Sequence, residues 1–134
     1  MKFVNLSQHK LGILNPLQPT KEFTFRGRQQ LALDAEPHLV ISLPPWEGAL
    51  PEVVRTSGDE REVDGVSILF EGTEEIKNLP SPQEGTIFIT SYQAAKAAWS
   101  LGRKDICCPG QLVFVEPHQG RGEIAGCLGL KGSK

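Results

Sequence analysis

The chain has 134 residues, of which 39% are hydrophobic and 22% charged, and its formal net charge is −2. This composition is typical of one folded domain and excludes a disordered chain. The slight acidic excess argues against duplex nucleic acid as a partner, because proteins that bind duplexes usually carry a basic excess or a basic face. No run approaches the roughly 20 apolar residues that span a bilayer, and the N-terminus is too polar for a secretion signal. We therefore expect no membrane partner and a cytoplasmic location.

Short apolar runs separated by glycine and proline predict a β-rich domain with many turns. In one run, Phe23 and Phe25 alternate with polar residues, which is the period-2 pattern of a half-buried strand. The run 66–70 is similar and is expected to be more buried, whereas the charged segment 57–64 is interpreted as a solvated turn. The predicted strands cover residues 2–6, 11–14, 22–25, 38–43, 52–56, 66–71, 86–90, 111–116 and 123–128.

One helix is predicted, over residues 91–101. The Ser91 hydroxyl is suited to cap its first turn, and Gly102 is able to adopt the positive φ that often ends a helix. Four alanines keep this helix thin, which favours either close packing on the chain's own sheet or a helix–helix contact between subunits. The alanines are Ala94, Ala95, Ala97 and Ala98. The predicted fold class is α+β, a mainly antiparallel β-sheet with this one principal helix packed on it.

Two segments, residues 43–51 and 78–85, are predicted to be loops from their proline and glycine content. Neither is long or simple enough to be a linker between domains, and no internal repeat is found. The sequence therefore predicts a single domain over residues 1–134.

A search for catalytic motifs gives a largely negative result. The sequence contains no Walker-type phosphate loop, and no Gly-x-Gly-x-x-Gly opens a helix after a strand. Its three histidines and three cysteines show no common metal-ligand spacing. We therefore expect a binding protein rather than an enzyme, with no cofactor and no metal.

The arginine side chains are candidate groups for binding a phosphate. Arg26 and Arg28 flank Gly27 at the end of a predicted strand, which lets two guanidinium groups converge, and Arg103 follows the helix close to Asp105. Guanidinium groups suit bidentate recognition of phosphate. On an acidic protein, the opposing interpretation is that these arginines are solvated or paired with carboxylates.

Aromatic side chains near the same segment complete a candidate nucleotide pocket. A ring from Phe88, Tyr92 or Trp99 would contact the base while arginine holds the phosphate. Ser91 heads the helix, where exposed N–H groups favour an anion.

Three stretches of sequence form a joint pattern. The chain opens with Val-Asn-Leu-Ser-Gln-His at residues 4–9, reads Leu-Pro-Ser-Pro-Gln-Glu-Gly-Thr-Ile-Phe-Ile-Thr-Ser at 79–91, and continues with Gly-Arg-Lys-Asp at 102–105. These stretches resemble the V-N-L-T-P-H, L-P-x-P-x-E-G-T-x-Y-I-V-S and G-R-x-D motifs of a family of small phage and bacterial proteins. Within that family the chain resembles the first type of phage anti-Thoeris sponge proteins. The likeness covers about residues 1–14 and 64–130, and residues 34–58 look like an insertion.

The resemblance implies an oligomeric phage protein that binds and sequesters cyclic ADP-ribose immune signals at subunit interfaces without cleaving them. Some relatives also hold cyclic oligonucleotides. Two departures bear on the ligand: Gln8 replaces the usual proline, and an Arg-Asp pair common in the family is missing near Val115, so either Arg121 substitutes or the ligand differs.

The expected assembly is a homo-oligomer, at least a dimer, with Ala94, Ala95 or Ala98 near the contact. Two alternatives stay open: a ligand-free phage structural or protein-interaction module, and an enzyme that degrades the signal. The residues expected to bind the ligand are Arg26, Arg28, Phe88, Ser91, Tyr92, Trp99, Arg103, Asp105 and Arg121.

Overall fold

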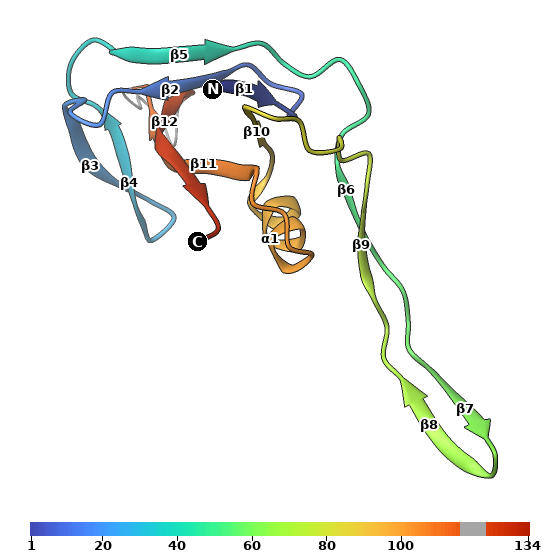
Figure 1. Ribbon diagram of the computed structural model, residues 1–134. Helices are drawn as coiled ribbons and strands as arrows, with labels where there is room; N and C mark the ends of the chain where they lie inside the picture. Colours follow the sequence, from blue (N-terminus) through green and yellow to red (C-terminus); the bar gives the residue numbers. More distant parts are fainter. Residues whose placement is uncertain (116–122) are drawn as a thin grey trace.

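The computed structural model describes residues 1–115 and 123–134. Most of this described chain is strand, with one short helix, which confirms the α+β class (Figure 1). The elements are β1 (Lys2–Asn5), β2 (Leu11–Leu14), β3 (Thr20–Phe25), β4 (Arg28–Leu33), β5 (Leu39–Leu43), β6 (Glu52–Arg55), β7 (Asp59–Val63), β8 (Val66–Phe70), β9 (Glu74–Lys77), β10 (Thr86–Ile89), α1 (Tyr92–Ser100), β11 (Ile106–Phe114) and β12 (Ile124–Gly132).

The main sheet has the strand order β1-β10-β11-β12-β2-β5, and the β3–β4 hairpin joins it through β4 and β11. Antiparallel pairing predominates, in β11–β12, β2–β5, β3–β4, β6–β9 and β7–β8. The pairs β1–β10, β10–β11, β4–β11 and β2–β12 are parallel, so the main sheet is mixed. Its two end strands, β1 and β5, are in contact, and the sheet therefore curves into a partly closed barrel.

Two apolar clusters lie on the two faces of this curved sheet. Adjacent residues of β10 separate them, because strand side chains alternate: Ile89 belongs to the inner cluster and Phe88 to the outer one, beneath α1. The inner cluster also contains Ile13, Leu43 and Cys127. The outer cluster also contains Leu6, Ala95, Ala98, Ile106 and Cys108.

Helix α1 begins and ends as its sequence predicts. The Ser91 hydroxyl accepts a hydrogen bond from the Ala94 N–H at 3.3 Å. At the other end Gly102 has φ +87°, and its N–H bonds to the Trp99 carbonyl while the Arg103 N–H bonds to the Ala98 carbonyl, both at 3.0 Å. This is the Schellman arrangement.

The four alanines of α1 are buried within the chain itself. Of the two interpretations of the thin helix, close packing on its own sheet is therefore the one observed. The chain itself covers the side chains of Ala94, Ala95 and Ala98, and a subunit contact near them stays a prediction. The described part of the chain contains no helix with both the length and the apolar character needed to cross a bilayer.

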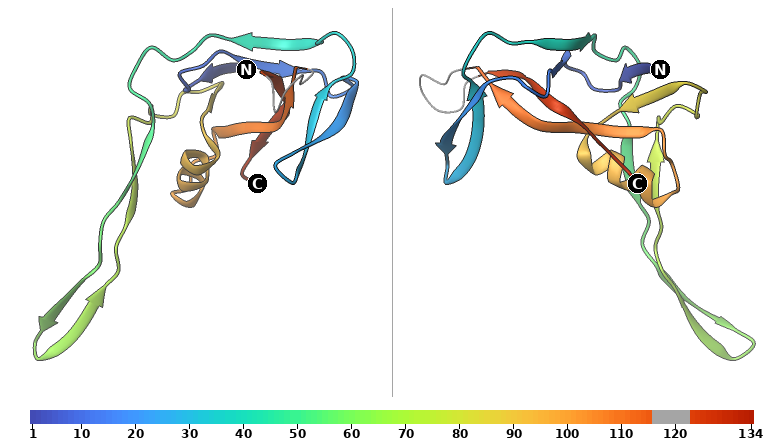
Figure 2. Two further views of the ribbon diagram at one scale, coloured as in Figure 1. Left: turned by 180° about the vertical axis from the view of Figure 1, so that it is seen from behind. Right: turned by 60° about the vertical axis from the view of Figure 1, so that its left-hand side comes forward.

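The segment 57–77 differs most from expectation. Residues 59–63 form strand β7 rather than a solvated turn, and β8 is exposed along its whole length rather than buried. The reason is the turn between them: Asp64 and Gly65 both have positive φ, which is the two-residue hairpin connection that Asp-Gly favours. The resulting ribbon continues β6 and β9 away from the body of the molecule (Figure 2), so no second layer covers it.

Replacing Ala98 with leucine tests the packing of α1 on the sheet. Ala98 is fully buried, so the added carbons of Ala98→Leu must displace packed neighbours, and we expect a loss of about 1–3 kcal/mol in the free energy of unfolding. Lys96→Leu, on the exposed side of the same helix, is the matched control and should change stability by less than about 0.5 kcal/mol. Urea unfolding followed by tryptophan fluorescence measures both, and equal midpoints would contradict this packing.

Candidate functional site

Arg103 lies directly after α1, where the Schellman turn redirects the chain. Its Nε and Nη2 atoms donate to the two carboxylate oxygens of Asp105 at 2.8 Å each, and Nη2 also donates to the Pro80 carbonyl at 2.9 Å. Both charged side chains are only 19% exposed. We call this arrangement the Arg103 clamp, because it ties the end of the helix to the loop between β9 and β10.

The clamp sets the charge state of Asp105. The hydrogen bond from Arg103 is the main reason that the pKa of the Asp105 carboxyl lies below its ordinary value, although partial burial opposes the shift. Asp105 is therefore ionised at neutral pH, and most of the guanidinium fork is already engaged within the chain.

The arginines expected to share a phosphate are not brought together. Arg26 and Arg28 are exposed at the tip of the β3–β4 hairpin, where the Arg26 guanidinium lies 5.2 Å from the ring centre of Phe25. That hairpin and α1 lie on the two sides of β11 and β12 (Figures 1 and 2). Within the described chain, Arg103 therefore has neither arginine beside it, and Arg121 lies outside the described residues.

The expected aromatic residues support the helix rather than an arginine site. Phe88 is 2% exposed in the cluster beneath α1. The Trp99 indole N–H donates to the Ile106 carbonyl at 2.8 Å, and Tyr92 meets the edge of Trp99 with ring centres 6.4 Å apart. Ser91 is used in capping the helix. Of these side chains, Phe88 also lines a pocket.

A groove of about 810 Å³ opens between β1 and the two loops predicted from proline and glycine content. We call it the Trp46 groove. Strand β1 lies along it, the end of β5 and the loop after it contribute residues 43–48, and the loop before β10 contributes Pro80 and Gln83. The range interpreted as an insertion, residues 34–58, thus supplies both a strand of the main sheet and part of this groove. The lining residues are Lys2, Phe3, Val4, Asn5, Leu43, Pro44, Pro45, Trp46, Glu47, Gly48, Pro80, Gln83 and Phe88.

The Trp46 indole is held in place by its own loop. Its main-chain N–H donates to the Ser7 carbonyl at 2.8 Å, and its indole N–H donates to the Ala49 carbonyl at 3.3 Å. A Cβ atom at Gly48 would lie 2.7 Å from the indole nitrogen, so glycine is needed for this close approach. The ring is thereby fixed before any ligand arrives, which reduces the entropy lost on binding.

Asn5 anchors the same loop from β1. Its side-chain oxygen accepts hydrogen bonds from the Ser7 N–H and hydroxyl at 3.0 and 2.7 Å, and its amide donates to the carbonyls of His9 and Pro44 at 2.8 and 3.1 Å. Asn5 is 4% exposed. The Asn-Leu-Ser-Gln-His motif is therefore a structural turn that also fastens one wall of the groove.

The lining of the groove combines flat apolar surfaces with few charges. Among its lining residues, Lys2 supplies a cation and Glu47 an anion. Pockets of this volume, apolar with a few polar groups, suit a small molecule of a few hundred daltons. This lining fits a planar ring that carries an anionic group.

The sequence interpretation missed Lys2 and Trp46 as site residues. A signal was available in Pro44-Pro45-Trp46, because an aromatic residue directly after two conformationally restricted prolines is unusual in a plain connecting loop. The segment was interpreted only as a loop. Lys2 carries no local signal, since an isolated lysine near an N-terminus is ordinary.

The three cysteines are free thiols on β11 and β12. Burial is the main cause that raises the pKa of the Cys107, Cys108 and Cys127 thiols. All three therefore remain protonated at neutral pH and serve as small apolar side chains.

No family model, curated protein or solved structure matches the chain. The family resemblance therefore rests on the three sequence stretches, which the structure places at the end of β1 and the turn after it, in β10 with the loop before it, and in the Arg103 clamp.

Removing the Arg103 clamp should cost stability. Arg103→Ala leaves the Asp105 carboxylate partly buried without its partner and frees the Pro80 loop, so we expect a loss of about 1.5–3 kcal/mol in the free energy of unfolding. Arg55→Ala, which removes an exposed ion pair with Glu74, is the matched control and should cost less than about 1 kcal/mol. Urea unfolding measures both, and an Arg103→Ala loss no larger than that of Arg55→Ala would refute the clamp's structural role.

The clamp also predicts a pH dependence. Because the pKa of Asp105 is lower in the folded chain than in the unfolded chain, its contribution is fully present above the unfolded pKa, near pH 4, and is lost as the pH falls through the folded pKa. The stability difference between wild type and Asp105→Asn should therefore be largest at neutral pH and shrink below about pH 4. Thermal unfolding across this range measures it, and a constant difference would show that the carboxylate charge is not what matters.

Proposed function

We propose that this chain is a binding protein that holds a nucleotide signal of the cyclic ADP-ribose type in the Trp46 groove without cleaving it. The observation that carries the proposal is the lining of that groove, in which a pre-positioned indole, three prolines and a lysine line one opening of about 810 Å³. The site differs from the arginine pocket expected from the sequence.

Each part of such a ligand has a counterpart in the lining. A purine base stacks on aromatic faces, a contact worth about 1–3 kcal/mol per base, and Trp46 offers that face. The Lys2 ammonium pairs with a phosphate as a point charge. Glu47 accepts hydrogen bonds from ribose hydroxyls.

Arg103 has an indirect part in this proposal. Its guanidinium fixes the carbonyl of Pro80, a residue that lines the groove, so the clamp shapes one wall and leaves phosphate binding to Lys2. Arg26, Arg28 and Arg121 remain candidates for a second phosphate contact only if a neighbouring subunit presents them. A phosphate contact from a neighbouring subunit requires an oligomer, and the family resemblance implies one.

The biological role that follows is that of a phage anti-defence protein acting in the cytoplasm of the host bacterial cell. By sequestering the signal, it would prevent activation of the immune effector that responds to it. Cyclic oligonucleotides are a second ligand class for the same groove, since they present the same bases and phosphates.

A second candidate function is a ligand-free phage structural or protein-interaction module. The observation that favours it is the exposed β7–β8 ribbon, which has the character of an association surface.

Calorimetric titration with cyclic ADP-ribose tests the proposed ligand site. Lys2→Gln removes the cation from the groove and should weaken binding about tenfold to a hundredfold, since charged hydrogen bonds are worth about 1.5–3 kcal/mol. Trp46→Leu keeps an apolar contact with the core but removes the stacking face, and we expect a similar loss. Lys96→Gln, on the exposed side of α1, is the matched control and should bind as wild type does.

The fate of the ligand separates the three functions. After incubation, the protein is denatured by heat and the supernatant is analysed by chromatography. A sponge depletes the free ligand and returns it intact, an enzyme returns product, and a ligand-free module never depletes it. Product formation that stops in Glu47→Gln would replace the proposal with catalysis by that carboxylate.

A further inference from the structure

The Trp46 groove lies along the edge of β1 rather than over one of its faces. Side chains of a strand alternate between the two faces of the sheet, so a pocket over one face is lined by every second residue. Here all four consecutive residues of β1, Lys2–Asn5, line the groove. The groove therefore opens at the side of the strand, where the main-chain N–H and carbonyl groups point.

The main chain of β1 is paired on one side only. Within the described chain β1 pairs with β10 alone, and the Lys2 N–H donates to the Gly85 carbonyl at 2.7 Å. Main-chain groups of successive strand residues point to opposite sides, so those of Phe3 and Asn5 point away from β10. Asn5 is buried and Phe3 is partly exposed, so Phe3 is the residue whose N–H and carbonyl face the groove.

The opposite wall of the groove leaves these two groups unoccupied. Strands β1 and β5 are in contact where the barrel closes, but they are not paired with each other. Pro44 and Pro45 follow β5 and have no N–H to donate, and the Pro44 carbonyl already accepts from the Asn5 side chain. Among the described residues, none is hydrogen-bonded to the Phe3 main chain.

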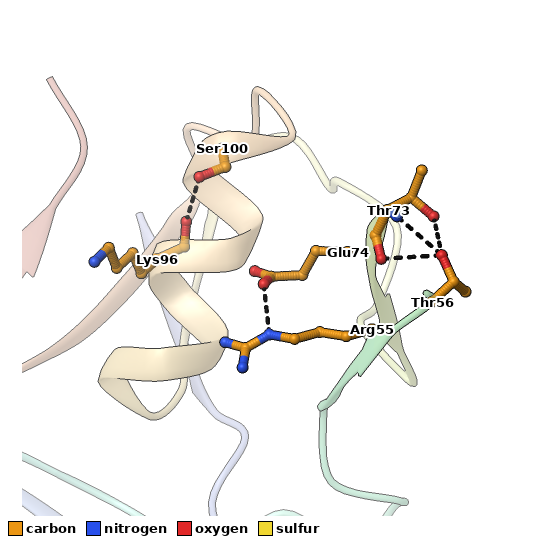
Figure 3. A network of polar contacts seen from close by, with 6 residues as sticks. All are labelled: Arg55, Thr56, Thr73, Glu74, Lys96 and Ser100. Atoms are coloured by element: carbon orange, nitrogen blue, oxygen red, sulfur yellow. Dashed lines mark hydrogen bonds and ion pairs between the residues drawn. The ribbon is translucent and has the colours of Figure 1, made fainter. Parts of the chain in front are cut away.

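The ribbon outside the main sheet shows the contrasting, closed arrangement. The Thr56 N–H donates to the Thr73 carbonyl at 2.8 Å, and the Thr73 N–H donates to the Thr56 hydroxyl at 2.9 Å (Figure 3). Beside them the Arg55 Nε atom donates to Glu74 at 2.9 Å. These polar groups are paired within the chain, whereas the Phe3 N–H and carbonyl need a partner from any ligand that covers them.

Adenine offers the matching pair of groups. Its N7 atom accepts a hydrogen bond and its neighbouring exocyclic amine at position 6 donates one. Neither atom takes part in a glycosidic bond of cyclic ADP-ribose, so both stay free in the ligand. Hypoxanthine carries an oxygen at position 6, as guanine does, and this acceptor would face the Phe3 carbonyl without a proton between them.

We propose that the main chain of Phe3 recognises adenine, with its carbonyl accepting from the amine at position 6 and its N–H donating to N7. This inference rests on the proposed function and deepens it, because it makes the free edge of β1 the element that selects the base. Trp46 packs against the outer apolar cluster and the Phe3 side chain against the inner one, so a flat ring that continues the plane of β1 lies between two aromatic side chains.

A single heterocycle fits this edge better than a peptide strand does. Added strands gain their affinity from main-chain hydrogen bonds repeated along the edge. In this groove one residue, Phe3, supplies one donor and one acceptor, which is the number that one edge of a base can use.

Ligand analogues test the two hydrogen bonds separately by calorimetry on the wild-type chain. Cyclic 7-deaza-ADP-ribose has a C–H group in place of N7, and cyclic inosine diphosphate ribose has an oxygen in place of the amine. We expect each to bind about tenfold or more weakly than cyclic ADP-ribose, because each leaves a covered main-chain group of Phe3 unpaired. Equal affinities of the three ligands would overturn the proposal.

Phe3→Pro assigns the N7 contact to this residue. The substitution removes the outward N–H, and proline is tolerated at an edge strand where the N–H takes no part in pairing. In Phe3→Pro we expect cyclic ADP-ribose and its 7-deaza analogue to bind equally, since the partner of N7 is gone. Phe3→Leu keeps the N–H and is the matched control, in which the 7-deaza analogue should stay about tenfold weaker. A 7-deaza penalty that persists in Phe3→Pro would refute the assignment.

The remaining outcomes separate this inference from the proposed function. Thermal unfolding verifies that each variant is folded, and if Phe3→Pro is not, the three ligands on wild type and Phe3→Leu still decide. If cyclic ADP-ribose binds no more tightly than its analogues, the groove proposal stands and the Phe3 contacts are refuted. If cyclic ADP-ribose does not bind at all, both are refuted.

Discussion

The Arg103 clamp is the constraint on which the groove depends. One guanidinium joins the end of α1, the Asp105 carboxylate and the Pro80 carbonyl, so a single side chain fixes a helix terminus and a loop together. Charged hydrogen bonds of this kind exceed neutral ones in strength, and here both partners are largely shielded from water. On the other side of the groove, Asn5 plays the corresponding part by holding the carbonyl of Pro44.

The local features of the fold followed from the sequence, because their causes are local. The Ser91 cap, the alanine-rich helix and the Gly102 terminus lie within one short segment, and the helix forms where they predict it. Parallel pairings such as β1 with β10 join residues far apart in the chain, and no local pattern signals them. Strands β4, β7 and β9 were missed. For β4 and β7 the Arg26-Gly27 and Asp64-Gly65 turns were available as hairpin signals.

The site was harder to predict than the fold because its residues come from segments that lie far apart in the chain. The motifs singled out Arg103 and Asp105 as ligand-binding residues, but they did not show that the Asp105 carboxylate and the Pro80 carbonyl already occupy the guanidinium. The Trp46 groove is assembled from three distant segments, so its lysine and its indole share no spacing that a sequence could reveal.

The two tryptophans allow the central claim, ligand binding in the Trp46 groove, to be tested in one spectrum. In ¹⁵N-labelled protein, the indole N–H of Trp46 lies in the groove loop, whereas that of Trp99 is bonded to the Ile106 carbonyl beneath α1. On titration with cyclic ADP-ribose, the account predicts that the Trp46 indole signal moves in proportion to occupancy while the Trp99 signal stays in place. A bound ligand that moves the Trp99 signal and leaves Trp46 unchanged would contradict it.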